Sequence, residues 1–349
     1  MKQTRWIRTT VLACAAMMLF AACSSKDADP TGQAIDPPPA GWEAKGDGQG
    51  EDSDLEASLE PTMKVTLYAK DPNGYVAPVT VNMPLTEGVA RKTLEYMVEG
   101  GPGEALLPEG FTALLPKGTV VQGLDINKQH AIVDFSSEFV NYNPQDERKI
   151  LEAVTWALTG FDTVDKVTIW VDGQPLTEMP VHGTPVDGEL TRKMGINLEW
   201  PDQVNIGMTV PVTVYFMDRT AEDYSYLVPV TRFVERTDDL AQAALKELLK
   251  GPREGTGLAS VVSPDIGLLG VSLADDRQLV SVNFDDKLLG MDNKIPATAA
   301  QAVILSLSET TGAPQVQLMV NGDSRYTSTD NLDFTHPVNR PVHINPYHL

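Results

Sequence analysis

Two short stretches with the same order of apolar and polar residues lie far apart in the chain. Residues 65–71 read VTLYAKD and residues 212–218 read VTVYFMD, and this composition predicts a β-strand that ends in a turn at each place. The residues downstream of both stretches also match, at an offset that stays between 147 and 150 positions. Because chance similarity would not keep this register, the chain contains two copies of one unit.

Apolar spacing predicts the same series in both copies: an extended segment, a helix, a two-stranded segment, a second helix and a last strand. In the first copy these elements cover residues 77–85, 87–102, 119–139, 146–161 and 167–176. In the second copy they cover residues 226–236, 238–252, 267–288, 296–312 and 316–325. Each copy closes with a short extended tail, RKMGIN in the first and RPVHIN in the second.

The ends of these elements carry residues typical of helix ends and tight turns. The first helix of each copy runs into Gly-Pro, at Gly101-Pro102 and at Gly251-Pro252. Glycine favours the left-handed end of a helix and proline prevents its continuation, so we expect both helices to end there. The last strands run into Asp172-Gly173 and Asn321-Gly322, which predict type I′ turns.

The order of elements predicts the fold class. Helices that pack on one face of a mostly antiparallel or mixed sheet form an α+β sandwich. We therefore predict an α+β fold with two tandem copies of a small sandwich domain, at residues 62–198 and 210–346. Residues 199–209 are the expected linker between the domains.

The N-terminus predicts a lipoprotein signal peptide over residues 1–22. Lys2 and Arg5 precede an apolar run of about a dozen residues, which is shorter than a membrane-spanning helix requires. The run ends in LFAACSSKD, which resembles a bacterial lipobox with Cys23 as the lipidated first residue of the mature chain. Cys14 also follows small residues, but cleavage there would leave almost no apolar run before it. The alternative is an ordinary secreted protein in which Cys23 is incidental.

Lipidation of Cys23 predicts both the location and the partners of the mature chain. Two acyl chains suffice for stable anchoring, so we expect a diacylglycerol on Cys23 to hold the protein to the outer face of the cell membrane. The mature chain would have no other cysteine, which excludes disulfides, cysteine nucleophiles and thiolate metal sites.

Residues 23–61 are rich in Pro, Gly, Asp and Glu and predict a disordered acidic linker. A net charge of −21 argues against nucleic acid as a partner.

The sequence offers no catalytic constellation. Nucleophile-elbow, P-loop, dinucleotide-binding and zinc-protease motifs are missing, and the histidines have no metal-ligand spacing (His130, His182, His336, His343, His348). The paired aspartates at 238–239, 275–276 and 285–286 fit caps and turns better than an acid/base pair. Asp134 of the first copy corresponds to Asn283 of the second, which would remove a catalytic carboxylate but keeps a hydrogen-bonding group.

We therefore predict a non-enzyme with no catalytic, cofactor-binding or metal-binding residue; a degenerate active site in one copy is the alternative.

The matched elements together resemble the GerM-like sporulation and spore germination lipoproteins, which carry tandem GerMN domains. The resemblance is carried by VTLYAKD and VTVYFMD, EGGP and LKGP, IVDFS and VSVNFDD, VTIWVDG and VQLMVNG, the closing RPVHINP and the lipobox-like Cys23. It implies a non-enzymatic role in the envelope complex between mother cell and forespore, with protein partners there and no small-molecule substrate. It also implies domains similar to the ring-building modules of secretion and sporulation channels, and it maps no binding residue onto this chain.

Two other functions fit a lipoprotein of this organisation. One is a ligand-binding lipoprotein that captures a small molecule between its two domains, which a ligand-dependent thermal shift would reveal. The other is a cell-wall enzyme or its modulator, for which hydrolysis of peptidoglycan by the purified protein would be the evidence.

Overall fold

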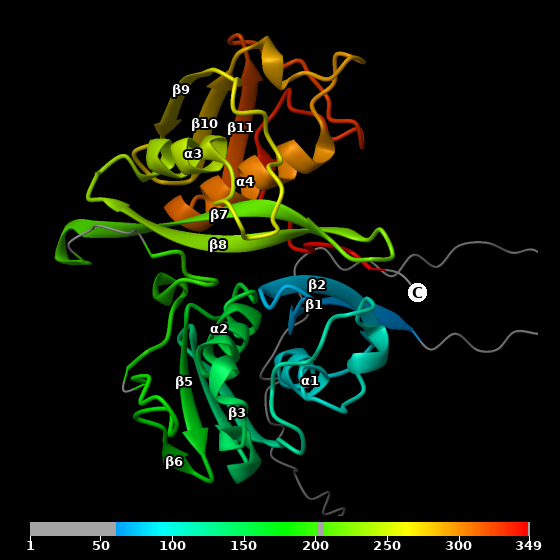
Figure 1. Cartoon of the computed structure of the whole chain (residues 1–349), viewed down its shortest axis with the longest axis vertical. Helices are drawn as coiled ribbons and strands as arrows, with labels where there is room; N and C mark the ends of the chain where they lie inside the picture. Colours follow the sequence, from blue (N-terminus) through cyan, green and yellow to red (C-terminus); the bar gives the residue numbers. More distant parts are fainter. Residues whose placement is uncertain (1–60, 187, 201–205, 348–349) are drawn as a thin grey trace, which may run out of the picture. The chain divides into compact units, whose positions relative to one another are not determined.

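The computed structural model describes residues 61–186, 188–200 and 206–347, shown in Figure 1. The predicted signal peptide, Cys23 and nearly all of the acidic linker lie outside the described residues. Both repeats fall within one compact unit of the chain, Ala34–Leu349. None of the helices in the described ranges has the length and apolar character needed to span a bilayer.

The first repeat has the predicted order of elements. Its strands and α-helices are β1 (Thr62–Lys70), β2 (Val76–Pro84), α1 (Val89–Tyr96), β3 (Val121–Asn127), β4 (His130–Phe135), α2 (Glu147–Leu158), β5 (Lys166–Val171) and β6 (Gln174–Pro175). Short 3-10 turns lie between them at η1 (Glu104–Leu106), η2 (Ser137–Val140), η3 (Pro144–Asp146) and η4 (Arg192–Met194).

The second repeat follows the same series. It contains β7 (Thr209–Arg219), β8 (Ser225–Glu235), α3 (Leu240–Lys250), β9 (Leu268–Leu273), β10 (Leu279–Phe284), α4 (Ala297–Thr311), β11 (Gln315–Val320) and β12 (Val338–Asn339). Its 3-10 turns are η5 (Ile206–Met208) and η6 (Asp286–Leu288). The predicted α+β fold with two tandem units is therefore confirmed.

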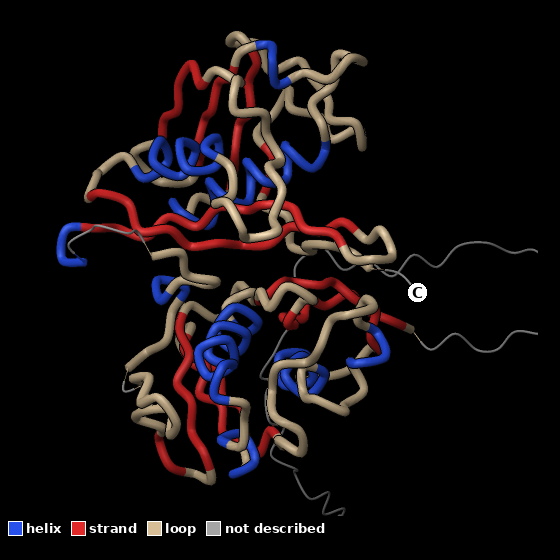
Figure 2. The backbone as a smooth tube through the Cα atoms, in the orientation of Figure 1, coloured by secondary structure: helices blue, strands red, loops and turns tan. Residues whose placement is uncertain are grey.

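Each repeat consists of a two-stranded hairpin and a four-stranded mixed sheet (Figure 2). The hairpins are β1–β2 and β7–β8, and the sheets have the orders β3-β4-β5-β6 and β12-β11-β10-β9. The central pairs β4–β5 and β10–β11 are parallel, whereas their neighbours are antiparallel. A parallel pair needs a long crossover connection, and α2 and α4 supply it.

Strict alternation of side chains builds the core. Every second residue of β4 and of β10 is buried, including Phe135 and Phe284 at the strand ends. Phe135 stacks on Phe139 at 4.3 Å between ring centroids, and Trp156 of α2 is fully buried. The main hydrophobic cluster includes residues of both repeats, so the two units share one apolar interior.

The predicted end of the first helix is wrong in the first repeat and right in the second. Helix α1 ends at Tyr96, before Gly101-Pro102, because the chain that follows pairs with another segment. Leu115 donates its N–H to the carbonyl of Met97 (3.0 Å) and accepts from the N–H of Glu99 (2.9 Å). These bonds replace the next helical turn. In the second repeat α3 reaches Lys250, and Gly251 follows it with a positive φ of 77°.

The predicted Asx-Gly turns are confirmed by positive φ angles at both residues of Asp172-Gly173 and of Asn321-Gly322. In each turn the glycine N–H donates to a side chain of the neighbouring strand. The acceptor is Asp134 Oδ1 in the first repeat (3.0 Å) and Asn283 Oδ1 in the second (2.8 Å). An aspartate and an asparagine perform the same structural task, which explains how the two copies tolerate this difference.

Candidate functional site: the junction of the two repeats

The aspartate pairs singled out in the sequence serve local structure. Asp239 accepts from the N–H of Gln242 at the start of α3 (2.9 Å), and Asp276 accepts from the N–H of Gln278 in a turn (3.0 Å). Asp285 caps η6 in the same way. Across the described ranges, His, Cys, Asp and Glu side chains nowhere gather in a group of three that could hold a metal.

The polar residues that recur in both repeats gather instead where the repeats meet. Asn197, at the end of the first repeat, reaches the hairpins of both units. Its Nδ2 donates to the carbonyl of Val76 in β2 (2.8 Å) and to that of Pro229 in β8 (2.7 Å), and its Oδ1 accepts from the N–H of Val76 (2.8 Å). One side chain therefore joins the two hairpins.

Asn345, at the end of the second repeat, makes the reciprocal set of bonds. Its Nδ2 donates to the carbonyls of Leu227 in β8 and Pro78 in β2, each at 2.8 Å, and its Oδ1 accepts from the N–H of Leu227 (2.8 Å). Both asparagines have positive φ, 48° for Asn197 and 53° for Asn345. Asparagine tolerates this backbone region better than most residues, so residue type and geometry agree.

The backbone around these asparagines also crosses between repeats. Glu199, just after the first repeat, donates its N–H to the carbonyl of Thr231 in β8, and Tyr347, just after the second repeat, donates to Thr80 in β2, each at 2.9 Å. Each closing segment thus forms a parallel bridge to the other repeat's hairpin. The closing tails expected from the sequence therefore connect the two repeats through hydrogen bonds.

The aspartates that end the two opening motifs lie at the same junction. Asp71 Oδ1 accepts from the backbone N–H groups of Asn73 and Tyr75, while its Oδ2 accepts from the hydroxyl of Tyr226 in the second repeat (3.0 Å). Asp218 accepts from the side-chain amide of Asn73 (2.8 Å). Burial, opposed by these hydrogen bonds, raises the pKa of Asp71 to about 6.

A buried ionic triad forms a further link across the junction. Glu309 near the end of α4 is 4% exposed at its side chain, and its Oε2 accepts from Arg192 Nη1 and Arg340 Nη2, each at 2.5 Å. Arg192 belongs to the first repeat, whereas Arg340 belongs to the second. Burial alone would raise the pKa of Glu309, but the two guanidinium groups hold it below its usual range.

Two buried tyrosines of the opening motifs lie beside the triad. Burial raises the pKa of both Tyr68 and Tyr215, so both phenols stay neutral at physiological pH. The Tyr215 hydroxyl has no hydrogen-bond partner among the described residues.

The residues that form this junction recur in the sequence, but only the fold shows that they contact the other repeat. Arg and Asn recur in the two closing tails, and Tyr and Asp recur in the two opening strands. From the sequence alone these residues predict only strands, turns and tails. Their partners lie in the other repeat, so sequence spacing within one repeat does not identify them.

Three comparisons place this architecture among known proteins. A family model described as "Sporulation and spore germination" (Germane) matches residues 66–177 and 213–326. The chain is 36% identical over 348 residues to the spore germination protein GerM of Bacillus subtilis, with 94% of each chain covered. The solved structure of the tandem GerMN domains of that protein is 39% identical, covers 81% of this chain and all of its own, and superposes with a TM-score of 0.75. The chain therefore belongs to the Germane family of sporulation and spore germination proteins, and it is a GerM homologue with tandem GerMN domains.

Proposed function

We propose that the chain is a membrane-anchored, non-enzymatic lipoprotein that acts in sporulation and spore germination. In this proposal it is an interaction module of the envelope complex between mother cell and forespore. Membership of the family supports a role in sporulation and spore germination. The arrangement of the junction supports a role in binding other proteins.

The observation that carries the proposal is the use made of the recurring polar residues. Asn197 and Asn345 each form side-chain hydrogen bonds to both hairpins, and Arg192 and Arg340 both bind the carboxylate of Glu309. An active site needs a reactive group that faces a substrate with a base or an acid beside it. The repeated polar groups instead join two domains into one scaffold, which suits binding to other proteins.

The outer strands of the two sheets are the surfaces that favour protein contacts. Strands β3 and β9 each form one edge of their sheet, opposite the two-residue edge strands β6 and β12, and an edge strand presents unpaired backbone groups to a partner. Leu269 on β9 is 55% exposed, and Val120, next to β3, is 54% exposed. Equivalent edges of both repeats therefore carry an exposed apolar side chain.

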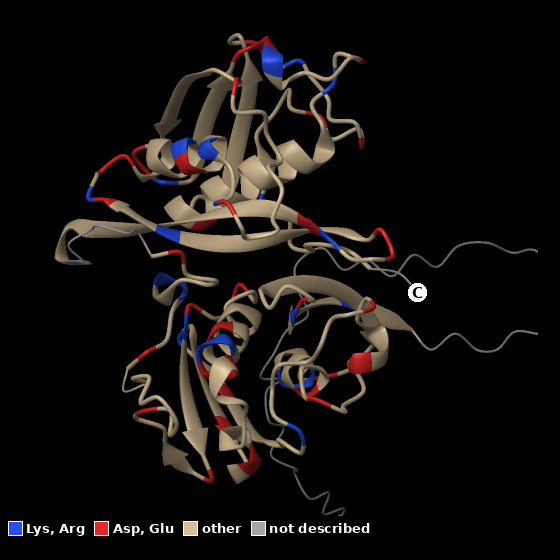
Figure 3. Ribbon diagram, viewed as in Figure 1, with Lys and Arg blue, Asp and Glu red and all other residues tan. Residues whose placement is uncertain are grey.

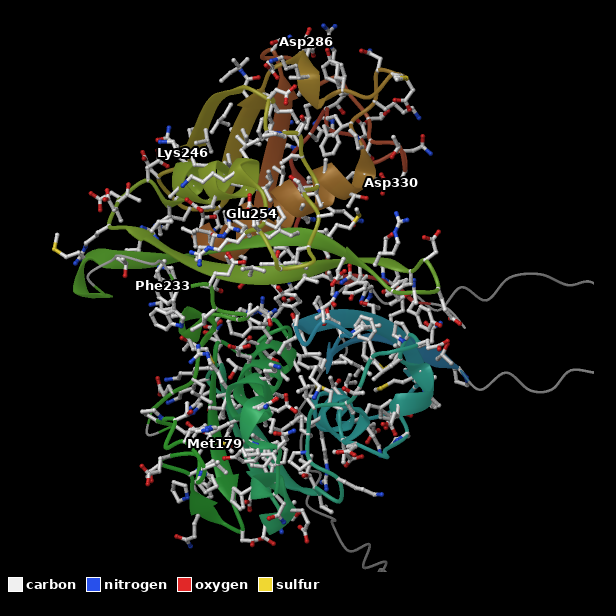
Figure 4. All side chains as sticks on the ribbon, in the orientation of Figure 1. Met179, Phe233, Lys246, Glu254, Asp286 and Asp330 are labelled. Carbon is white, nitrogen blue, oxygen red and sulfur yellow. The ribbon has the colours of Figure 1, made fainter. Side chains whose placement is uncertain are left out.

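Charged and aromatic side chains on other surfaces are weaker evidence for a protein-binding site than the strand edges. Acidic and basic side chains are spread over the loops and helices of both repeats (Figure 3). Phe233 on β8, labelled in Figure 4, stacks on Trp200 at 4.6 Å between ring centroids, and Trp200 is half exposed. This stacked pair is a further exposed apolar surface, and the strand edges differ from it in that they also present backbone donors and acceptors.

Replacing Leu269 tests the proposed surface. In a spore-forming host, the tagged full chain should capture envelope proteins of the sporangium, and Leu269→Lys should reduce that capture. Met291→Lys is the matched control, because it adds the same charge at a fully exposed apolar residue in a loop of the same repeat. Unimpaired capture and normal spore yield with Leu269→Lys would rule out β9 as the contact surface. Normal spore formation and germination after deletion of the gene would contradict the proposed function as a whole.

The anchor has its own test. Cys23→Ser should release the chain from the membrane fraction and abolish labelling with a radioactive fatty acid, while Cys14→Ser should change neither. A Cys23→Ser variant that stays in the membrane fraction would show that the protein is held there by another means.

A further inference from the structure

A cavity of about 710 Å³ opens beside the ionic triad. It is formed by β1, the loop after α2, the end of α4 and the closing segment of the second repeat. Four basic side chains line it, namely Lys64, Arg192, Arg340 and His343, together with the acidic Asp162 and Asp165. Three of these side chains, Lys64, Arg192 and Arg340, are cations in a chain whose net charge is −21.

The cavity exists because the two repeats differ in the length of one helix. Helix α4 runs to Thr311, and Thr310 near its end bonds to the backbone of Thr213 in β7 (3.1 Å). Helix α2 ends at Leu158, so no such turn covers β1. Thr66, which holds the place of Thr213 in β1, lines the cavity instead.

The same difference removes one of two equivalent carboxylates. When Val167 is aligned with Val316, Gly160 of the first repeat takes the place of Glu309 of the second. A Cβ atom at Gly160 would lie 3.9 Å from Arg192 Nη2 and 3.2 Å from the carbonyl oxygen of Ala157, and Gly160 lines the cavity. Both repeats have the arginine, but only the second repeat has the carboxylate. The cavity lies where the first repeat has Gly160 in place of a glutamate.

One carboxylate therefore serves two guanidinium groups, which leaves one guanidinium charge uncompensated within the triad, while Asp162 and Asp165 line the same cavity. Arg192 has partners for its Nε and both Nη atoms: Thr159, Glu309 and the carbonyl of Trp156. For Arg340, by contrast, the bond to Glu309 is the only side-chain hydrogen bond within the described part of the chain. Its remaining N–H donors are available to a ligand, in the planar geometry that suits an oxyanion.

Lys64 and His343 line the cavity at its exposed rim. Both side chains are exposed, and Lys64 forms no ion pair within the described ranges. Partial burial, and to a smaller extent the charge of Lys64, lower the pKa of His343. Lys64 therefore provides a second cation near the mouth of the cavity.

We propose that this cavity binds a small molecule through one anionic group, a carboxylate or a phosphate, held by Arg340 beside Arg192, with Lys64 at the mouth. Asp162 and Asp165 repel further negative charge, which favours a ligand with a single anionic end over a polyanion. The inference departs from the expectation of no small-molecule substrate, and it does not depend on the proposed role in the envelope.

Thermal unfolding of the full lipidated chain in detergent tests the site with two probes, inorganic phosphate and acetate. Sodium chloride at the same ionic strength is the reference. At ten times its Kd, a probe that binds should raise Tm by about 2 °C along a saturating curve. The response to each probe distinguishes a phosphate site from a carboxylate site. If neither differs from chloride, the proposal is overturned.

Gly160→Glu is the sharpest variant, because it supplies the carboxylate that the first repeat lacks. We expect a higher Tm than that of Gly160→Ala without any probe, because both variants share the close contact of Cβ with the Ala157 carbonyl, and loss of the probe response, since the new carboxylate would take the place of the ligand's anion. Gly160→Ala is the control and should keep the response within about twofold, because a methyl group leaves both arginines available. A full response in Gly160→Glu would overturn the proposal.

Lys64→Ala provides a test that does not depend on tolerance of a buried glutamate. Since Lys64 is exposed, the variant should fold with an unchanged Tm in chloride and bind the active probe about threefold to tenfold more weakly. Lys246→Ala, at an exposed lysine of α3 (Figure 4), removes the same charge away from this cavity and should leave binding unchanged. Equal binding by both variants would contradict the proposed role of the cavity wall.

Discussion

Asn197 and Asn345 hold equivalent places in the two repeats, and each binds its own repeat's hairpin and the hairpin of the other repeat. Asn197 reaches Pro229 in β8, whereas Asn345 reaches Pro78 in β2. Each proline holds the same position in its hairpin as the other, so the two links are related by an approximate two-fold symmetry. The duplication has therefore produced an interface as well as two domains.

We predict that Asn345→Ala lowers the free energy of unfolding by about 3 kcal/mol or more. The change removes three hydrogen bonds to backbone groups of Leu227 and Pro78, and Asn345 is 8% exposed, so water does not readily replace them. Alanine at a φ of 53° adds strain of about 1 kcal/mol. Urea unfolding of both proteins measures the difference.

Asn345→Gly separates the two causes, because glycine adopts positive φ without strain. It should be more stable than Asn345→Ala by roughly 1 kcal/mol and still clearly less stable than the parent protein. If the glycine variant matches the parent protein, the side-chain bonds of Asn345 contribute nothing measurable to the junction.

The same asparagine shows where prediction from the sequence ends. The strands, the second helices and the Asx-Gly turns follow from local spacing and turn chemistry, and Asp134 and Asn283 fit that reading. The role of Asn345 does not follow from local chemistry, because its partner Pro78 is 267 positions away. The early end of α1 at Tyr96 has a similar cause, since Leu115 competes for the backbone of the next turn. Contacts between distant segments override local signals in both cases.

We predict that Glu309→Gln destabilises the protein by about 3–5 kcal/mol. The variant leaves Arg192 and Arg340 beside each other without a compensating charge in a largely buried place. Adding Arg340→Gln to Glu309→Gln should restore part of the loss, because it removes one of the two uncompensated cations. Chemical denaturation of the four members of this double-mutant cycle gives the coupling energy.

Glu87→Gln is the control for that cycle, since Glu87 is an exposed glutamate and its change should shift stability by less than about 0.5 kcal/mol. A double variant that is less stable than Glu309→Gln alone would mean that Arg340 contributes packing rather than an excess charge.

Asp71 should make the stability of the protein depend on pH. Burial raises the folded-state pKa of Asp71 to about 6, above its value in the unfolded chain. The folded protein therefore binds the proton more tightly, and its stabilising effect is complete below about pH 4 and lost as the pH rises through about 6. Two pKa units correspond to roughly 2–3 kcal/mol.

Asp71→Asn should remove this dependence, because an amide keeps the acceptor oxygen for the N–H groups of Asn73 and Tyr75 but carries no charge. The variant should match the parent protein near pH 4 and become more stable than it by up to about 2–3 kcal/mol at pH 8. Urea unfolding at a series of pH values measures this crossing. Asp276→Asn, at an exposed turn, should follow the parent curve. A constant gap between Asp71→Asn and the parent protein would assign Asp71 an ordinary pKa.

The repeats also predict which substitutions the turns tolerate. Asp134→Asn copies into the first repeat the residue that the second repeat has at Asn283, and both side chains accept the same glycine N–H. We expect a change in stability within about 0.5 kcal/mol. Asp134→Ala removes the acceptor and should cost about 1 kcal/mol. Thermal and urea unfolding of the two variants make the comparison. If Asp134→Asn costs as much as Asp134→Ala, then the carboxylate charge of Asp134 has a role that the hydrogen bond to the turn does not explain.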